Sequence, residues 1–198
     1  MLTLVRHAAT DWSGVRYCGR TDVPLSSVGR EQLRPLVAYL SSVTLDRTAV
    51  ITSPASRSRE TAKAIAAAMG SELRVDDRLR EVDFGDAEGL TFADVERRWP
   101  QLAAALALGD DQVDWPGGER SRDLTERVRA AWAELSERSA AAVAVTHGGP
   151  LRTMLELALP SWPSMLPQRL APADVVRLAR GEEWTIAAFW SAESGVKW

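Results

Sequence analysis

The chain contains two histidines, and each one follows a short apolar run of the kind that forms a buried strand. His7 follows Leu-Thr-Leu-Val-Arg, and His147 follows Ala-Val-Ala-Val-Thr. Ligands of open α/β sheets bind outside the carboxyl ends of the strands, so both imidazoles should face one site. A lone histidine is usually a surface or structural residue. Two at matching strand ends favour a chemical role, because neutral imidazole is a competent nucleophile near its ordinary pKa.

The residues beside these histidines suit a phosphate group. Arg6 precedes His7, and Arg57 falls in the first turn of a helix that we expect to open at Ser53-Pro54. A planar guanidinium matches phosphate oxygens, although Arg57 could also be an exposed arginine of that helix. Gly148 follows His147 at the start of another expected helix, where free N–H groups and the macrodipole favour anions.

A zinc site is the competing chemical interpretation of these side chains. It would need three or four ligands at suitable spacing, and Cys18 with two distant histidines forms no such pattern. We therefore expect no metal and no cofactor. The single cysteine also excludes an internal disulfide and fits a reducing compartment.

Composition narrows the class of protein. The chain has 198 residues, 45% of them hydrophobic and 26% charged, which suits one domain over residues 1–198. Its formal net charge is -3, so general nucleic-acid binding is not expected. No secretory signal and no run long enough to span a bilayer is recognisable. We expect a cytoplasmic protein that binds no membrane.

The elements that must position these residues alternate along the chain. Apolar and β-branched runs predict strands at 2–5, 49–52, 73–75, 141–145, 175–178 and 185–190. Capping signals and periodicity predict helices at 27–40, 53–70, 91–99, from 100, 121–138 and from 150. Pro35 should either kink the first helix or mark its true start. The alternation predicts an α/β fold: a three-layer sandwich whose mostly parallel central sheet has helices on both faces.

Six sequence blocks, in order, resemble the histidine phosphatase superfamily, which includes the cofactor-dependent phosphoglycerate mutases. They are L-V-R-H-A-A-T at 4–10, Y-C-G-R-T-D-V-P-L at 17–25, S-P-A-S-R-S-R-E-T-A at 53–62, L-R-E-V-D-F-G-D-A-E-G-L at 79–90, P-G-G-E at 116–119 and T-H-G-G-P-L-R at 146–152. The resemblance covers roughly the first three quarters of the chain. Its blocks include every charged group that phosphoryl transfer needs.

The resemblance implies a role for each matching residue. His7 would attack phosphorus and become a phosphohistidine, and Glu81 would protonate the leaving oxygen and later assist a water. Asp83 is the second choice for that acid. The remaining implied substrate contacts are Arg6, Arg57, His147, Thr10, Ser13, Cys18, Gly19 and Gly148. The unprotonated nitrogen of His7 requires the other ring nitrogen to donate to a fixed acceptor such as a backbone carbonyl.

The chain departs from the family pattern beside the nucleophile. Ala8 replaces the usual glycine, and its methyl group should crowd the loop or require a negative φ. Ala9 stands where many members have Glu, Ser13 where Asn is common, and Ala87 where Trp often precedes Glu-Gly. None of these changes removes a core catalytic group, so we expect altered pocket walls in an active enzyme.

The expected function is a metal-independent phosphomonoesterase that hydrolyses a small phosphorylated metabolite, similar to α-ribazole phosphatase and broad-specificity phosphatases. A phosphoglycerate mutase is the second hypothesis, although its E-R-H-Y-type segment after the acid is missing here. An inactive binding or signalling relative and a protein-phosphohistidine phosphatase rank lower.

Aromatic residues leave the substrate and the assembly open. The pocket entrance could be lined by Trp12, Tyr17, Arg20, Trp115 and Trp162. Tryptophans near the carboxyl end, Trp184, Trp190 and Trp198, suit either internal packing or the interface of a homodimer.

Overall fold

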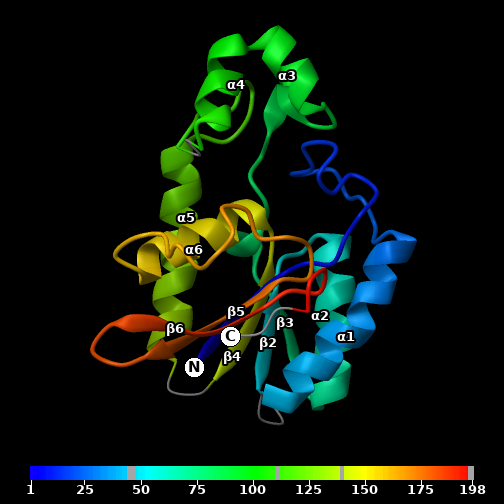
Figure 1. The fold of residues 1–198 in the computed structure, drawn as a ribbon, viewed down its shortest axis with the longest axis vertical. Coiled ribbons are helices and arrows are strands. Elements are labelled where there is room, and N and C mark those ends of the chain that lie inside the picture. The colour runs from blue at the N-terminus through cyan, green and yellow to red at the C-terminus, as the bar shows by residue number, and fades with distance from the viewer. Residues whose placement is uncertain (44–47, 110–111, 139–140, 196–198) are drawn as a thin grey trace.

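The computed structural model describes residues 1–43, 48–109, 112–138 and 141–195 (Figure 1). These residues form a six-stranded sheet in the order β3-β2-β4-β1-β5-β6. The strands are β1 (Leu2–Arg6), β2 (Ala49–Thr52), β3 (Leu73–Val75), β4 (Ala142–Thr146), β5 (Val175–Arg180) and β6 (Trp184–Trp190). The first four in chain order pair in parallel, whereas β5 is antiparallel to both β1 and β6. The prediction of a mostly parallel sheet is confirmed.

Helices cover both faces of this sheet, as predicted. Those in the described residues are α1 (Ser27–Val43), α2 (Ser56–Met69), α3 (Phe92–Arg98), α4 (Pro100–Ala107), α5 (Ser121–Glu137) and α6 (Gly148–Ala158). The core on one face includes Leu36 of α1 and Ile65 of α2. The core on the other includes Val128 of α5 and Leu151 of α6. The two cores make the fold a three-layer sandwich.

The strands supply both cores because successive side chains point to opposite faces. In β4, Ala142 and Ala144 belong to the α5–α6 core, and Val143 and Val145 belong to the α1–α2 core. All four side chains are buried. A central parallel strand that is buried on both faces has a continuous apolar sequence, and this pattern is what predicted β4.

Two predicted helix starts need correction, and one alternative that the sequence left open is decided. Helix α2 begins at Ser56 with Ala55 before it and no side-chain cap, so Ser53-Pro54 is not the cap and first residue. Helix α6 begins at Gly148, two residues before Pro150. Pro35 lies inside α1, which excludes the interpretation that it marks the start of that helix. The capping box at the start of α3 is confirmed.

The carboxyl ends of the parallel strands all face the same part of the molecule. In Figure 1, α3 and α4 form a cap beyond that edge of the sheet. The loop after β1, the chain between β2 and α2, and the turn from β4 into α6 meet beneath the cap. His7, Arg57 and His147 lie in or beside these connections, and Glu81 lies in the segment after β3. Ligands of open α/β sheets bind at this edge.

The tryptophans near the carboxyl end pack inside the molecule. Trp184 lies edge-on to Trp132, with ring centroids 5.3 Å apart, and Trp190 stacks on Tyr39 at 5.0 Å. Trp198 lies outside the described residues. Within the part of the chain that the structure describes, no helix has the length and apolar character to cross a bilayer.

Candidate active site

The two histidines meet at the carboxyl ends of neighbouring strands. His7 follows β1 and His147 follows β4, and these strands pair in parallel with Arg6 opposite Thr146. The imidazole centroids lie 4.9 Å apart at an interplanar angle of 65°. Both side chains are buried. The two histidines are 140 positions apart in the sequence. The structure confirms the expectation that they converge.

The imidazole of His7 is held in one tautomer. Its Nδ1 lies 2.7 Å from the carbonyl oxygen of Ala8, and because a carbonyl can only accept, Nδ1 carries the proton. Nε2 is then unprotonated, as a nucleophile requires. Burial lowers the pKa of His7 well below its ordinary value, and the charges of Arg57 and Arg6 lower that pKa further. The expected backbone acceptor for the second nitrogen is confirmed.

Ala8 fits the loop without the glycine that the family usually has. Its methyl group is fully buried in the α1–α2 core, and its amide donates to Oγ1 of Thr61 at 3.1 Å. Ala173 is the one described non-glycine residue with a positive φ, so the φ of Ala8 is negative. The alanine therefore costs no backbone strain here.

His147 lies deeper than His7 and has a hydroxyl partner. Its Nε2 lies 2.7 Å from Oγ of Ser53, and its Nδ1 is buried without a hydrogen-bond partner. Burial lowers the pKa of His147 well below its ordinary value, with further lowering by His7 and Arg57. The sequence interpretation assigned Ser53 to a helix cap and so missed this contact. Its position at the start of the block containing Arg57 was the available signal.

Arg57 is anchored by backbone carbonyls and almost fully buried. Nη1 donates to Thr21 O at 3.0 Å, and Nη2 donates to Cys18 O and Gly19 O at 3.1 and 2.9 Å. Cys18 and Gly19 thus reach the site through their carbonyl oxygens, which orient the guanidinium. Its Nε has no partner.

A single carboxylate holds the loop that carries those carbonyls. Glu88 accepts hydrogen bonds from the amides of Gly19, Arg20 and Thr21, the best of them 2.9 Å long. Gly19 allows this approach, because a Cβ there would lie 2.0 Å from the carbonyl oxygen of Val82. The Glu-Gly pair of the 79–90 block was recognised in the sequence without this role.

Arg6 is the last residue of β1, and hydrogen bonds from its side chain and its backbone amide hold it in place. Its Nη1 donates to the carbonyl of Leu170, and its backbone amide donates to Asp174 O at 3.0 Å. Burial lowers the pKa of Arg6, while the carboxylates of Glu81 and Asp174 oppose that shift. A guanidinium nonetheless keeps its charge at neutral pH.

Three nitrogens at this site are buried and lack a hydrogen-bond partner: Arg6 Nε, Arg57 Nε and His147 Nδ1. Buried polar groups in folded proteins are otherwise almost always paired, and an unpaired one costs free energy. An oxyanion beside His7 could accept from such groups. Local positive charge on an otherwise acidic chain fits that ligand.

Glu81 contacts the start of helix α6. Its Oε2 accepts from the Gly148 amide, and its Oε1 accepts from the amides of Gly149 and Val82, all at 3.0 Å. The Gly148 amide, predicted to bind substrate, therefore contacts the candidate acid here. Any side chain at Gly149 would collide with it, since a Cβ would lie 2.7 Å from Oε1. Asp83 instead accepts from the Gly85 amide.

An ion pair that the sequence did not predict supports the backbone at Glu81. Arg127 of α5 donates to the carbonyls of Arg80 and Glu81 at 2.8 and 3.1 Å. It also donates a hydrogen bond to each carboxylate oxygen of Glu119, at 2.6 and 2.9 Å. Both side chains are largely buried. Glu119 ends the P-G-G-E block, which was the available signal.

Thr10 and Ser13, two of the predicted substrate contacts, bond to each other in the loop after β1. The Thr10 amide donates to Ser13 Oγ at 2.9 Å, and the two hydroxyls lie 3.2 Å apart. This pairing orders the first turn of the loop after Ala9. The Ser13 side chain, at a position where Asn is common in the family, is thus long enough to bond to Thr10 within this turn.

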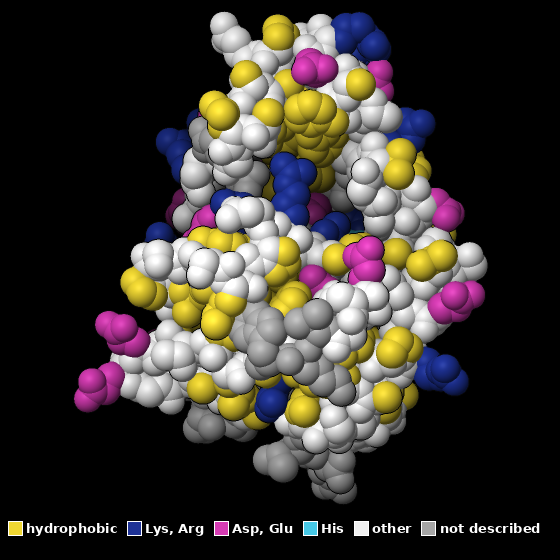
Figure 2. All heavy atoms as spheres, in the orientation of Figure 1, with side chains coloured by type: hydrophobic (Ala, Val, Ile, Leu, Met, Phe, Trp, Pro, Cys, Tyr) yellow, Lys and Arg dark blue, Asp and Glu magenta, His cyan; other side chains and the backbone are white. Residues whose placement is uncertain are grey.

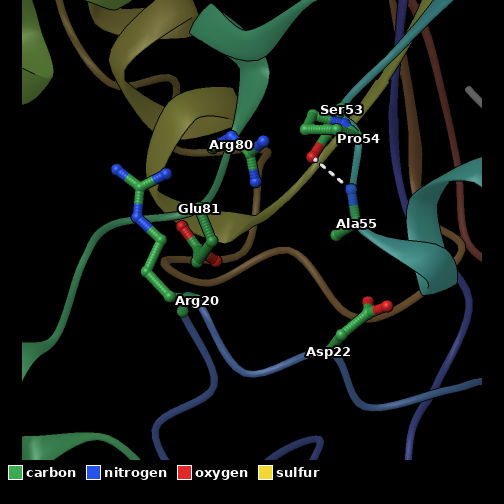
Figure 3. A pocket seen from close by; sticks show the side chains of 8 residues that line it. Arg20, Asp22, Ser53, Pro54, Ala55, Arg80 and Glu81 are labelled. Carbon is green, nitrogen blue, oxygen red and sulfur yellow. Dashed lines mark hydrogen bonds between the residues drawn. The ribbon is translucent and has the colours of Figure 1, made fainter.

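A cavity of about 190 Å³ opens beside Glu81 (Figure 3). Its lining consists of Gly19, Arg20, Asp22, Ser53, Pro54, Ala55, Arg80 and Glu81. Figure 2 shows basic side chains gathered in a recess between the cap and the sandwich. Among the described residues, no cluster of three or more His, Cys, Asp or Glu is placed to hold a metal.

Of the residues expected at the pocket entrance, Tyr17, Trp115 and Trp162 pack against neighbouring side chains. Of that set, Arg20 alone lines the cavity. Tyr17 and Trp115 pack against Phe84, with centroids 5.1 and 4.7 Å from it. Trp162 lies under the guanidinium of Arg152 at 5.0 Å. These contacts give the three rings a packing role, which sequence position alone could not reveal.

Residues 2–191 match the family model described as "Histidine phosphatase superfamily (branch 1)". Phosphoglycerate mutase-like protein 4 of Arabidopsis thaliana is 34% identical over 190 residues, which cover 93% of this chain and 82% of that one. The probable phosphoglycerate mutase GpmB of Salmonella choleraesuis is 31% identical over 196 residues, 96% of this chain and 90% of that one.

A solved structure of mycobacterial glucosyl-3-phosphoglycerate phosphatase with VO3 superposes with a TM-score of 0.81 at 29% identity. That match covers 96% of this chain and 98% of the other. A putative alpha-ribazole-5'-P phosphatase of Escherichia coli has the same fold, with a TM-score of 0.73 at 23% identity over 93% of each chain. The chain belongs to the histidine phosphatase superfamily, branch 1.

Proposed function

We propose that this protein is a phosphomonoesterase that hydrolyses a small phosphorylated metabolite through a phosphohistidine formed on His7. The observation that carries this proposal is the set of buried, unpartnered nitrogens of Arg6, Arg57 and His147 beside an imidazole with an unprotonated Nε2. Family membership and phosphatase structures among the similar proteins support the same activity. The cavity beside Glu81 is smaller than the roughly 300–1,000 Å³ typical of drug-sized ligands, which supports a small substrate.

In the first step Nε2 of His7 attacks phosphorus. A P–N bond forms as the P–O bond to the leaving group breaks, and Glu81 gives its proton to the departing oxygen. Negative charge on the three other phosphoryl oxygens is stabilised by Arg6 and Arg57, whose donors are already oriented.

In the second step a water attacks the phosphohistidine. The carboxylate of Glu81 takes a proton from that water, the P–N bond breaks, and inorganic phosphate and neutral His7 are released. The carbonyl of Ala8 restores the same tautomer after each turnover, because it can accept only from a protonated Nδ1.

The test is phosphate release from a panel of phosphate esters by wild type and His7→Ala, with trapping of the phosphoenzyme. We expect the wild type to form an acid-labile, base-stable phosphoprotein, as a P–N bond requires, and His7→Ala to form none. The exposed Arg30→Gln variant serves as a matched control for expression and folding. Equal phosphate release by wild type and His7→Ala would contradict the proposal.

A phosphoglycerate mutase is the second candidate, and the names of two similar proteins favour it. Incubation with 3-phosphoglycerate, with and without its bisphosphate, separates the two activities. Efficient conversion to the 2-isomer would favour the mutase, and release of inorganic phosphate would favour the phosphatase.

A further inference from the structure

The cavity beside Glu81 lies on one side of the reacting centre. Of the described residues, Glu81 is the member of the proposed catalytic set that lines it, whereas His7, Arg6, Arg57 and His147 do not. Glu81 is the proposed donor to the leaving oxygen. The cavity is therefore the place where the alcohol half of the substrate would lie.

Two arginines line this leaving-group cavity. Arg80 precedes Glu81 in the chain, and Arg20 comes from the loop between β1 and α1. In Figure 3 both lie on the same side of the cavity as Glu81, and Asp22 lies across from them. The Asp22 carboxylate is already engaged, since Oδ1 accepts from the Ser56 amide at 2.7 Å at the start of α2.

The existing partners of these arginines are exposed carboxylates, and Arg80 donates to Asp77 Oδ1 from Nε at 2.8 Å as well as from Nη2. Arg20 Nε lies 3.4 Å from Asp83 Oδ2, and the side chains are 39% and 40% exposed. Arg80 lies 2.7 Å from Asp77 Oδ1, and those side chains are 40% and 77% exposed. Exposed ion pairs contribute little to stability, and a guanidinium has five donors. Both arginines can therefore accept an additional or replacement anion at small cost.

The remaining lining argues against other leaving groups. Among the described residues, no aromatic side chain lines the cavity, so a nucleobase would have no ring to stack on. Pro54 and Ala55 supply little apolar surface for an alkyl chain. The basic side chains of this lining are those of Arg20 and Arg80, and a guanidinium group suits an anionic partner.

From this arrangement we propose that the leaving group of the substrate carries an anionic group of its own, a carboxylate or a second phosphate, which Arg20 and Arg80 bind. The proposal rests on the proposed phosphatase function and specifies its substrate class. Arg20 and Arg80 thereby act as specificity-determining residues.

The experiment compares two esters that differ in the leaving group's charge: 3-phosphoglycerate and glycerol 1-phosphate. We expect the wild-type kcat/KM to favour the acidic ester about tenfold or more, which is the worth of one charge-assisted contact. In Arg20→Gln and Arg80→Gln this ratio should fall severalfold, and in the double variant it should approach one. Arg30→Gln, which removes an exposed α1 charge paired with Glu60 and distant in sequence from the cavity lining, should keep the wild-type ratio.

A third ester, glycerol 1,3-bisphosphate, separates the two sources of negative charge. Preference for it over 3-phosphoglycerate supports a second phosphate, and the reverse preference supports a carboxylate. Where the wild type turns over neither glyceryl ester, the ratio of their inhibition constants against p-nitrophenyl phosphate measures the same discrimination. Thermal unfolding of each variant shows whether it is folded, and a variant that is not folded is replaced by Arg20→Lys or Arg80→Lys.

A wild-type ratio near one, or a ratio that survives both substitutions, overturns the inference while leaving the phosphatase proposal intact. The phosphatase proposal has its own readout. If the wild type does not hydrolyse p-nitrophenyl phosphate, or if His7→Ala hydrolyses it equally well, that proposal fails, and the substrate inference fails with it.

Discussion

The surroundings of His7 suit the nucleophilic role that we propose for it. Burial beside Arg57 and Arg6 lowers its pKa, and the Ala8 carbonyl selects the tautomer. His147 has a lowered pKa for the same leading reason, burial. Both rings should therefore be neutral at physiological pH, where neutral imidazole can attack phosphorus.

The two histidines allow a direct test by imidazole NMR, because the chain contains no others. We expect neither ring to titrate between pH 7.5 and the onset of acid unfolding. In the unfolded chain each ring binds a proton near pH 6.5, so their contribution to stability is lost as pH falls through that value. An inflection near pH 6.5 in the folded protein for either ring would contradict this account. His7→Asn assigns the resonances.

Glu81 gives a second prediction at this scale. Glu81→Gln should lower kcat/KM for an alkyl phosphate by about 10²–10⁴-fold, the usual contribution of a general acid. It should lower kcat/KM for p-nitrophenyl phosphate much less, because nitrophenolate leaves without a proton. Asp83→Asn is the matched control, since Asp83 was the alternative acid and its carboxylate accepts from Gly85. Equal losses for both esters would argue that Glu81 has only a structural role.

The residue types of the site were predictable, and their partners were not. His7, Arg57 and His147 stand in recognisable blocks, and strand ends fix where they meet. Ser53 contacts His147, and Thr61 contacts Ala8 beside His7, through tertiary contacts. Ser53 is 94 positions from His147, and Thr61 is 53 positions from Ala8. No local spacing rule reports such contacts.

Between elements, the Arg127–Glu119 pair ties α5 to the segment that carries Glu81. Arg127 donates to three successive parts of that segment, the carbonyls of Arg78, Arg80 and Glu81. Glu119 also accepts from the Asp83 amide. Glu81, the proposed acid, is therefore held through its backbone by Arg127 of α5.

Glu119→Gln should destabilise the fold, because it leaves the buried Arg127 charge without its partner. Loss of one member of a fully buried pair costs about 3–5 kcal/mol, and we expect about 2–3 kcal/mol here since the side chains are 18% and 10% exposed. Urea unfolding measures the change. Arg30→Gln, at the exposed pair with Glu60, should cost under about 1 kcal/mol. Equal effects of the two substitutions would contradict the assigned role of Arg127.

Helix starts show which local signals can be trusted. The capping box of α3 was predicted correctly because Thr91 and Asp94 satisfy each other within one turn. Ser53 resembled a cap but lies before the helix, where its hydroxyl contacts His147 and the Ala55 amide. Capping rules use only neighbouring residues in the sequence, so they cannot predict that the Ser53 hydroxyl bonds to His147 instead.

At the scale of the whole molecule, alternation of strands and helices was enough for the fold class. The strand order β3-β2-β4-β1-β5-β6 was not predictable, because parallel register depends on packing between distant segments. The position of α3 and α4 as a cap over the strand ends was equally hidden (Figure 1). A single domain over residues 1–198, a cytoplasmic location and a homodimer stay predictions.

Asp174 links the sheet to the site and sets a pH dependence for the whole fold. It lies at the start of β5, its Oδ2 accepts from the Ala171 amide at 2.7 Å, and its backbone carbonyl accepts from Arg6. Burial raises the pKa of Asp174 to about 6; hydrogen bonds from Ser191 and Ala171 and the charge of Arg6 lower it, and Glu193 adds to the rise. The ionised form is therefore disfavoured by folding.

The sign follows from the two states of the Asp174 carboxyl. In the unfolded chain it ionises near pH 3.9, so above pH 6 folding buries a charge, and below about pH 4 both states are protonated. Its contribution should make the fold more stable as pH falls from 7 towards 4. Asp174→Asn removes that dependence and should stabilise the protein at pH 7.5 by about 1–2 kcal/mol. The difference in unfolding free energy between wild type and Asp174→Asn, measured in urea from pH 5 to 8, isolates this carboxyl from the opposite trend of the histidines. A difference that does not vary with pH, or that grows as pH falls, would contradict the assignment.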